Sequence, residues 1–242
     1  MGVYVPRDER PVSGAVSLKM PMQAAIGFED DHLVIAWKPH GVLTSGNTGR
    51  TFVREVQRTI SEDSKATIFP CHRLDFGTSG WVIFGKDKES ARAMGLLFES
   101  QRITKQYVAL VHGHVPPAMK FAWPLDGKLA ETRVSLLAEG SIAGAGSVSF
   151  IEARPITGRT HQIRRHLFHA GHGIVGDDRY GDPESRYRGK GLFLSAYGLG
   201  FDHPLEPHRK VNLQALPSKK FGKVPFVHQS DFIRRFSLSS HE

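Results

Sequence analysis

The chain has 242 residues, enough for one large domain or two small ones, and its apolar and charged fractions, 40% and 23%, are those of a globular protein. A formal net charge of +8 favours a polyanionic partner, with nucleic acid ahead of a membrane surface. The single cysteine, Cys71, excludes a disulfide framework, and the chain has neither a membrane-spanning apolar run nor a signal-peptide core. We therefore expect a cytoplasmic protein with no membrane partner.

Apolar periodicity predicts the elements in chain order. Residues 1–24 show no periodicity and are interpreted as a tail. We expect strands at 32–43, 79–86, 105–115, 146–160 and 192–204, helices at 50–63, 87–101 and 161–172, and a hairpin over 122–140. Asp87 and Thr160 are candidate N-caps, Gly171 is a candidate C-cap, and Asp126-Gly127 is the candidate hairpin turn. Strands outnumber helices without strict β-α-β alternation. This favours an α+β fold with a mixed, mainly antiparallel β-sheet flanked by helices.

The stretch HRLDFGTSG, residues 72–80, places one carboxylate, Asp75, in a loop that runs into an apolar strand. Its letters resemble kinase motifs, but those motifs are separate loops, and here they overlap on a single aspartate. They also resemble an aspartic protease loop, whose chemistry needs two carboxylates, and no second such loop occurs in the chain. Both interpretations are rejected.

Four histidines, His161, His166, His169 and His172, suggest a metal site at helical spacing. Catalytic zinc motifs of this kind usually add a carboxylate base, and none lies between these residues. We therefore interpret them as polar or RNA-facing residues of a helix and expect no metal.

The remaining residues have complementary chemistry. An arginine beside Asp75 would keep the carboxylate ionised, and GRTHQIRRH supplies Arg164 at the start of a helix. An ionised, partly desolvated aspartate is a nucleophile of the kind that acts at a sugar C1′. An aromatic ring such as Tyr107 and an aliphatic side chain such as Ile163 could sandwich a flat base.

Three blocks in this order, HRLDFGTSG, KQYVALVHG and PITGRTHQIRRHLFHAGHGIVGDDRYG, preceded by WKPHGVL, resemble the RluA-type RNA pseudouridine synthases from about residue 28 to residue 205. The resemblance implies the pseudouridine synthase catalytic fold over 25–216, with a basic segment at 217–242. We expect no separate N-terminal RNA-binding domain, so the catalytic domain itself would hold the RNA, with residues 219–235 as a further candidate contact. A monomer is expected.

The resemblance also implies the chemistry. The enzyme would isomerise specific uridines in structured rRNA or tRNA to pseudouridine with Asp75 as the catalytic residue and no cofactor. Arg164 would pair with Asp75, Tyr107 would pack on the uracil and assist proton removal at C5, and Ile163 would lie on the other side of the base. Arg73 would fill the RNA stack when the uridine flips out.

Structural roles remain open for each residue. Asp75 could cap a turn, Tyr107 and Ile163 could be core residues, and Arg73 could bind phosphate at the surface. Two other functions also remain open: a catalytically silent RNA-binding protein, and a hydrolase that cleaves a base–sugar bond with the same aspartate.

Overall fold

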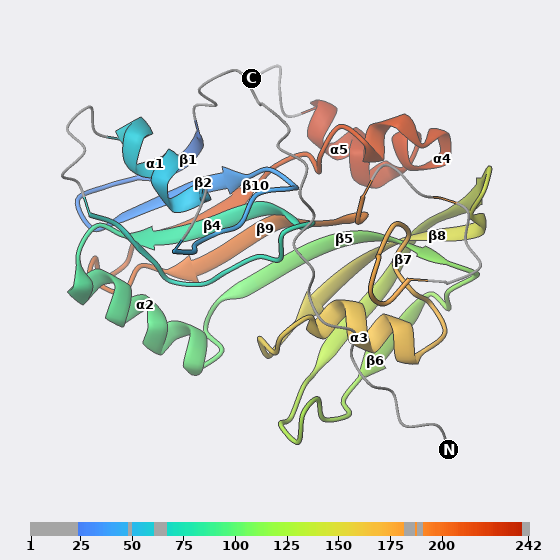
Figure 1. Ribbon diagram of the computed structural model, residues 1–242, viewed down its shortest axis with the longest axis horizontal. Coiled ribbons are helices and arrows are strands. Elements are labelled where there is room, and N and C mark those ends of the chain that lie inside the picture. Colours follow the sequence, from blue (N-terminus) through green and yellow to red (C-terminus); the bar gives the residue numbers. More distant parts are fainter. Residues whose placement is uncertain (1–23, 48–49, 61–66, 182–186, 188–190, 239–242) are drawn as a thin grey trace.

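The computed structural model describes the chain from residue 24 to residue 238, apart from residues 48–49, 61–66, 182–186 and 188–190 (Figure 1). The tail expected at 1–24 therefore lies outside the described residues except for Ala24. Among the described helices, none is long and apolar enough to cross a membrane.

Ten strands form one sheet (Figure 1). They are β1 (Ala25–Glu29), β2 (Leu33–Lys38), β3 (Phe69–Pro70), β4 (Ser79–Gly85), β5 (Thr104–His112), β6 (Ala118–Phe121), β7 (Thr132–Ile142), β8 (Gly146–Pro155), β9 (Leu194–Asp202) and β10 (Lys210–Gln214). Their order is β1-β2-β4-β9-β5-β8-β7-β6, with β3 on β4 and β10 on β9. Within the described chain only β4 and β9 pair in parallel, which confirms the mixed, mainly antiparallel sheet.

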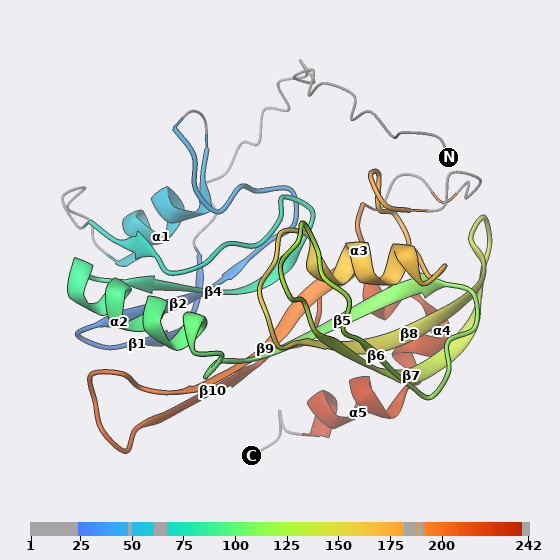
Figure 2. The same cartoon turned by 90° about the horizontal axis from the view of Figure 1, so that it is seen from below.

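Helices cover both faces of this sheet. They are α1 (Phe52–Ile60), α2 (Lys88–Glu99), α3 (Gln162–His169), α4 (Pro225–His228) and α5 (Asp231–Leu238), with a 3-10 turn at Phe221–Lys223. Helix α1 packs with Val34 and Val82, whereas α2 packs with Ile35 and Ile83. Because neighbouring strand residues point to opposite faces, α1 and α2 lie on opposite sides. Figure 2 likewise shows α3 on one side and α4 and α5 on the other.

Two local predictions are confirmed. Asp87 is the N-cap of α2, because its Oδ1 accepts a hydrogen bond from the amide of Ser90 at 2.7 Å. Asp126 and Gly127 both have positive φ, 51° and 72°, between the reciprocally bonded Leu125 and Lys128. Positive φ at both central residues is the mark of a type I′ hairpin turn, so the expected turn is present.

The predicted caps of α3 need correction. Thr160 is not its N-cap: that position belongs to His161, whose backbone is left-handed and whose side chain makes no capping bond. The C-cap is Ala170, and Gly171 follows it with φ of 82°. The C-cap therefore lies one residue before the predicted position, and Gly171 occupies the next position, where positive φ favours glycine.

The C-terminal residues carry an apolar face as well as basic charge. Phe221, Val227 and Phe232 are buried in the same hydrophobic cluster as Phe150 of β8, and the ring of Phe232 meets that of Tyr197 on β9 at 4.8 Å. Helices α4 and α5 therefore close the lower face of the sheet under β5, β8 and β9 (Figure 2).

The parallel contact between β4 and β9 depends on a glycine. Gly80 pairs with Ala196 at φ of 139°, and a Cβ at Gly80 would lie 2.3 Å from the carbonyl oxygen of Ala196. The adjacent hydroxyls of Ser79 and Ser195 are hydrogen-bonded at 3.1 Å. Only a residue without a side chain allows the two strands to approach this closely.

Gly80→Ala is expected to lower the free energy of unfolding by about 3 kcal/mol, because the added methyl group forces β4 and β9 apart. Gly95→Ala in α2 is the matched control. A Cβ at Gly95 meets no atom within 4 Å, so it should raise stability by about 0.5–1 kcal/mol. Urea denaturation of both variants measures this, and equal changes would contradict the role of Gly80.

The loop at 71–78, which leads into β4, is anchored by His72. Its Nε2 accepts the amide of Ile83 at 3.1 Å, and its ring packs on Phe98 at 4.9 Å. Burial, and then the charge of Lys105, lower the pKa of His72 to about 4. The imidazole is therefore neutral at pH 7 and needs its lone pair for the bond to β4.

This lowered pKa predicts a pH-dependent stability. Since the unfolded chain takes up the proton near pH 6.5 and the folded chain only near pH 4, stability is lost as the pH falls through that window, by up to about 3 kcal/mol. His72→Gln retains an acceptor that does not titrate. Its unfolding free energy should fall less steeply than that of the wild type between pH 6.5 and pH 4, and parallel curves would exclude this linkage.

Candidate active site

One cavity of about 460 Å³ opens beside the junction of β4, β9 and β5, and all five site residues predicted from the sequence line it. Arg73 and Asp75 come from the loop before β4, and Tyr107 lies on β5. Ile163 and Arg164 lie on the first turn of α3. The structure thus brings together residues that are up to 91 positions apart in sequence, from 73 to 164.

The carboxylate of Asp75 is held on one oxygen. Its Oδ2 accepts a hydrogen bond from Nη1 of Arg164 at 3.0 Å, whereas Oδ1 lies 3.6 Å from Nε2 of His161. The side chain is 24% exposed, so it is reachable from the cavity but largely withdrawn from water. This contact agrees with the pairing of Asp75 and Arg164 that the family resemblance implies.

Arg164 has a second acidic partner that sequence reasoning missed. The fully buried carboxylate of Asp177 accepts Nε and Nη2 of Arg164 at 2.7 and 2.8 Å and also the amides of Arg179 and Tyr180. Burial opposes the charge of Arg164, but the bonds and charges of Asp177 and then Asp75 outweigh it and raise the pKa of Arg164. The same contacts, against burial, hold the pKa of Asp177 below its usual value. Both groups are therefore ionised at neutral pH.

The loop that carries Asp75 is braced from behind by residues 38–44. Thr44 Oγ1 binds both the amide and the carbonyl of Leu74 at 3.1 Å, and the amide of Gly41 donates to the carbonyl of Phe76 at 2.7 Å. The buried Nζ of Lys38 donates to the carbonyls of Pro39 and Val42 within the brace. Burial lowers the pKa of Lys38 to about 8, although the charge of Asp75 opposes that shift.

The start of α3 is fixed by Gln162 instead of by a conventional cap. Its Oε1 accepts the amide of Arg159 and the hydroxyl of Thr157, and its Nε2 donates to Glu131 and Thr132 at the beginning of β7. These bonds replace the capping role expected of Thr160 and set the direction in which Arg164 leaves the helix.

Two side chains form walls of the cavity. Ile163 is 6% exposed and Tyr107 is half-buried. Burial, and then the charge of Asp75, raise the pKa of Tyr107, so its phenol stays protonated over the physiological range. Arg73 is exposed at the edge of the cavity.

His161 and Tyr180 complete the surroundings of Asp75. The imidazole Nδ1 of His161 lies 3.2 Å from the hydroxyl of Tyr180, and the two rings meet edge to face. Burial, with the charges of Arg164 and Arg179, lowers the pKa of His161 although Asp75 opposes this. His161 is therefore neutral at pH 7. Its spacing in the sequence did not indicate that it lies beside Asp75.

The other histidines of that segment make structural contacts. His166 is buried between Thr132 and the carbonyl of Trp123, and His172 binds the carbonyl of His112. Within the described residues, neither has the partners of a metal ligand.

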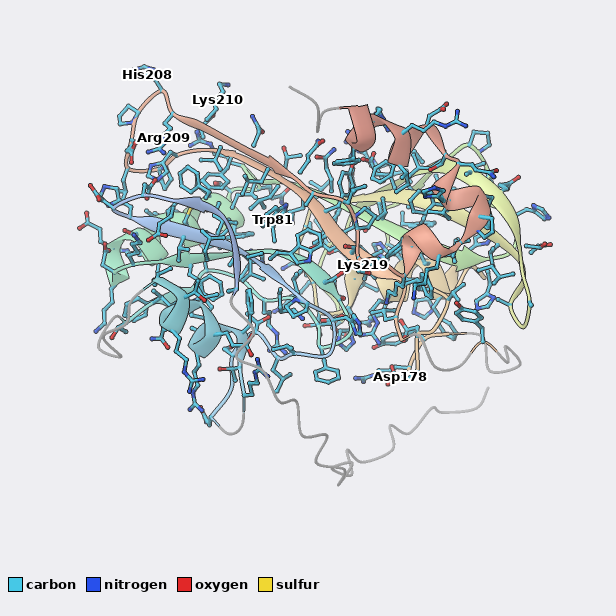
Figure 3. All side chains as sticks on the ribbon, turned by 90° about the horizontal axis from the view of Figure 1, so that it is seen from above. Trp81, Asp178, His208, Arg209, Lys210 and Lys219 are labelled. Atoms are coloured by element: carbon cyan, nitrogen blue, oxygen red, sulfur yellow. The ribbon has the colours of Figure 1, made fainter. Side chains whose placement is uncertain are left out.

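One group of metal-ligand type lies elsewhere, at the base of the turn between β9 and β10 that carries Arg209 (Figure 3). It consists of Asp30, His203 and Glu206. Nδ1 of His203 accepts the amides of Leu205 and Glu206, and its Nε2 lies 3.2 Å from Asp30. Arg209 pairs with both acids. These contacts hold the turn against the end of β1.

Comparisons with known proteins agree with this geometry. The family model of RNA pseudouridylate synthase matches residues 32–169. Ribosomal large subunit pseudouridine synthase C of Pasteurella multocida (strain Pm70) is 32% identical over 88% of this chain and 74% of its own length. The protein of the same name from Yersinia pestis is 34% identical over 82% and 67%.

Among solved structures, human RNA pseudouridylate synthase domain containing 1 superposes with a TM-score of 0.69 at 24% identity, over 85% of this chain and 87% of that one. The fold is thus shared at low identity. The family model matches more than half of the sequence. The chain therefore belongs to the RluA-type RNA pseudouridylate synthase family and is an isomerase.

Proposed function

We propose that this enzyme converts uridine to pseudouridine in ribosomal large-subunit RNA, with Asp75 as the catalytic residue and without a metal or cofactor. The names of its relatives support this choice of RNA. The observation that carries the proposal is the setting of Asp75: it lines the cavity with one oxygen bound to Arg164 and the other without a hydrogen bond among the described residues.

The reaction breaks the N1–C1′ bond of uridine, turns the uracil and joins C5 to C1′. A carboxylate at the sugar can attack C1′ or remove a proton from the sugar, and both routes need it ionised and shielded from water. Arg164 provides the carboxylate of Asp75 with a cation at 3.0 Å, and partial burial limits its hydration. At the end C5 loses its proton to water and N1 takes one up, so the RNA keeps its mass.

The walls of the cavity suit a flat base. Tyr107 would pack on one side of the uracil and Ile163 on the other, which fits an aromatic ring facing an aliphatic side chain across the cavity. The raised pKa of Tyr107 keeps its phenol protonated before substrate binds, so it could also donate a hydrogen bond to the base. Its assistance in proton removal at C5 stays part of the proposal.

The target must leave the RNA helix to reach Asp75, because the glycosidic bond is inaccessible in a stacked duplex. Arg73 is two residues before Asp75 and lies exposed at the edge of the cavity. Its planar guanidinium is suited to fill the gap that the flipped base leaves, since it stacks well and carries the charge that phosphates attract.

Asp75→Asn is expected to abolish turnover and to leave RNA affinity within about threefold of the wild type, because it removes the charge and changes little in shape. The assay is release of tritium to water from RNA labelled at uridine C5, taken from cells that lack this protein. The RNA is bulk ribosomal RNA, compared with bulk transfer RNA.

Asp202→Asn is the control for this variant, since Asp202 is 62% exposed on β9 and pairs only with Lys210 among the described residues. It should be fully active. Joint loss of activity and binding in Asp75→Asn would make Asp75 structural. Free uracil from the wild type would indicate a hydrolase, and bound RNA without tritium release would indicate a silent RNA-binding protein.

Arg164→Met is expected to reduce the rate of tritium release by about 100-fold or more, because Asp75 loses its cation. It should also lower the free energy of unfolding by about 3 kcal/mol, since Asp177 is left buried and unpaired. The double variant Arg164→Met with Asp177→Asn removes that buried charge and should regain stability without activity. Full activity in either variant would remove the pairing role of Arg164.

A further inference from the structure

The two oxygens of Asp75 have different surroundings. Oδ2 is fixed by Arg164 at 3.0 Å, while Oδ1 has no hydrogen bond of normal length among the described residues and faces Nε2 of His161 at 3.6 Å. Contacts in an active site without substrate are often long and tighten when substrate binds, and a shift of about 0.6 Å would bring this pair to hydrogen-bond length.

The proton of His161 is directed by Tyr180. If the Tyr180 hydroxyl donates to Nδ1, as the 3.2 Å contact allows, the neutral ring carries its proton on Nε2, the atom that faces Asp75. The charged and titratable groups around the ring are Asp75, Arg164, Asp177, Arg179 and Tyr180. Burial, with the charges of Arg164 and Arg179, lowers the pKa of His161 although Asp75 and Asp177 oppose this, so the ring stays neutral at pH 7.

Tyr180 is itself fixed by the charge cluster. Its amide donates to Asp177 Oδ1 at 2.9 Å, and the guanidinium of Arg164 lies 5.1 Å from its ring centre. Five residues are therefore linked in a ring of polar contacts, in which each contacts the next and the last contacts the first: Asp75, Arg164, Asp177, Tyr180 and His161.

The backbone of His161 indicates that its side chain is needed. Its φ of 52° and ψ of 28° lie in the left-handed region that favours glycine or asparagine, and its side chain makes no capping bond to α3. Gln162 already organises the start of the helix. A left-handed backbone is uncommon for residues other than glycine, although histidine adopts it more readily than most, and such an outlier beside a candidate catalytic residue points to a role for its side chain.

We propose that His161 is a positioning residue that donates from Nε2 to Oδ1 of Asp75 and orients the oxygen that meets the sugar, with Tyr180 setting its tautomer. This inference rests on the proposed role of Asp75. It makes Oδ1 the reacting oxygen, because Oδ2 is occupied by Arg164.

Two substitutions separate this role from a backbone role. His161→Asn suits the left-handed backbone and keeps a polar atom near Tyr180, but its amide does not reach Asp75. His161→Gln suits the backbone less well, but it places an amide N–H where Nε2 stands. We expect single-turnover tritium release at saturating RNA to fall about 10- to 100-fold in His161→Asn, with RNA affinity unchanged. His161→Gln should be at least about fivefold faster than His161→Asn.

Tyr180→Phe keeps the imidazole and its backbone and removes only the partner of Nδ1, so its rate should fall by about 3- to 10-fold with unchanged RNA affinity. Thermal unfolding of all three variants shows whether each is folded. The proposal would be overturned by a wild-type rate in His161→Asn, by a faster rate in His161→Asn than in His161→Gln, or by an unchanged rate in Tyr180→Phe. Failure of the wild type itself to release tritium would instead overturn the proposed function.

Discussion

The active site depends on one buried cation shared between two acids. Taking Arg164 out of water is costly, and only good geometry with satisfied partners offsets that cost. Asp177 supplies that geometry with two short bonds to the guanidinium, and the amides of Arg179 and Tyr180 satisfy its remaining capacity. Because Nε and Nη2 of Arg164 are both bonded to Asp177, Nη1 points in one direction only, toward Asp75. The orientation of the candidate catalytic carboxylate is therefore fixed by a carboxylate on the far side of the arginine.

The sheet brings the two sides of this cluster together through a strand that bears none of the predicted site residues. Strand β9 lies between β4, which follows the Asp75 loop, and β5, which carries Tyr107. It approaches both closely because small residues stand where the strands meet: Gly80 faces Ala196, and Gly198 leaves room for Gln106. The spacing of the strands beside the cavity thus depends on small residues that do not line it.

Local chemistry in the sequence predicted local structure well. The carboxylate of Asp87 and the pair Asp126-Gly127 specify a cap and a turn within four residues, so no distant contact can easily override them. Thr160 failed as a cap because the Gln162 side chain, anchored on β7 some 30 residues away, organises the same turn. The family resemblance located Asp75, Arg164, Tyr107, Ile163 and Arg73 at one cavity, which periodicity alone could not do.

Asp177 shows where sequence reasoning stops. It is adjacent to Asp178 in GDDRYG, and the two are chemically identical. The side chain of Asp177 is fully buried and hydrogen-bonded to Arg164, whereas that of Asp178 is 98% exposed at the surface (Figure 3) and only 3.8 Å from the same guanidinium. Which aspartate is hydrogen-bonded to the arginine depends on how the chain returns from α3 to β9. No local sequence pattern predicts that path. The C-terminal segment is a similar case. Its charges led to the prediction of a basic segment, whereas its apolar residues also close the core.

The depth of the site also explains why its cation is an arginine. Burial lowers the pKa of Lys38, and of Lys105 beside the cavity, to about 8, so a lysine at this depth is close to losing its charge. The pKa of Arg164 is raised despite burial, and its planar fork can serve two carboxylates at once, which a single ammonium group cannot do in the same geometry. A lysine in place of Arg164 would bind Asp177 or Asp75 as a point charge and leave the other acid short of a partner. A charge that burial does not remove and a planar fork together allow one cation to bind both Asp75 and Asp177 at this depth.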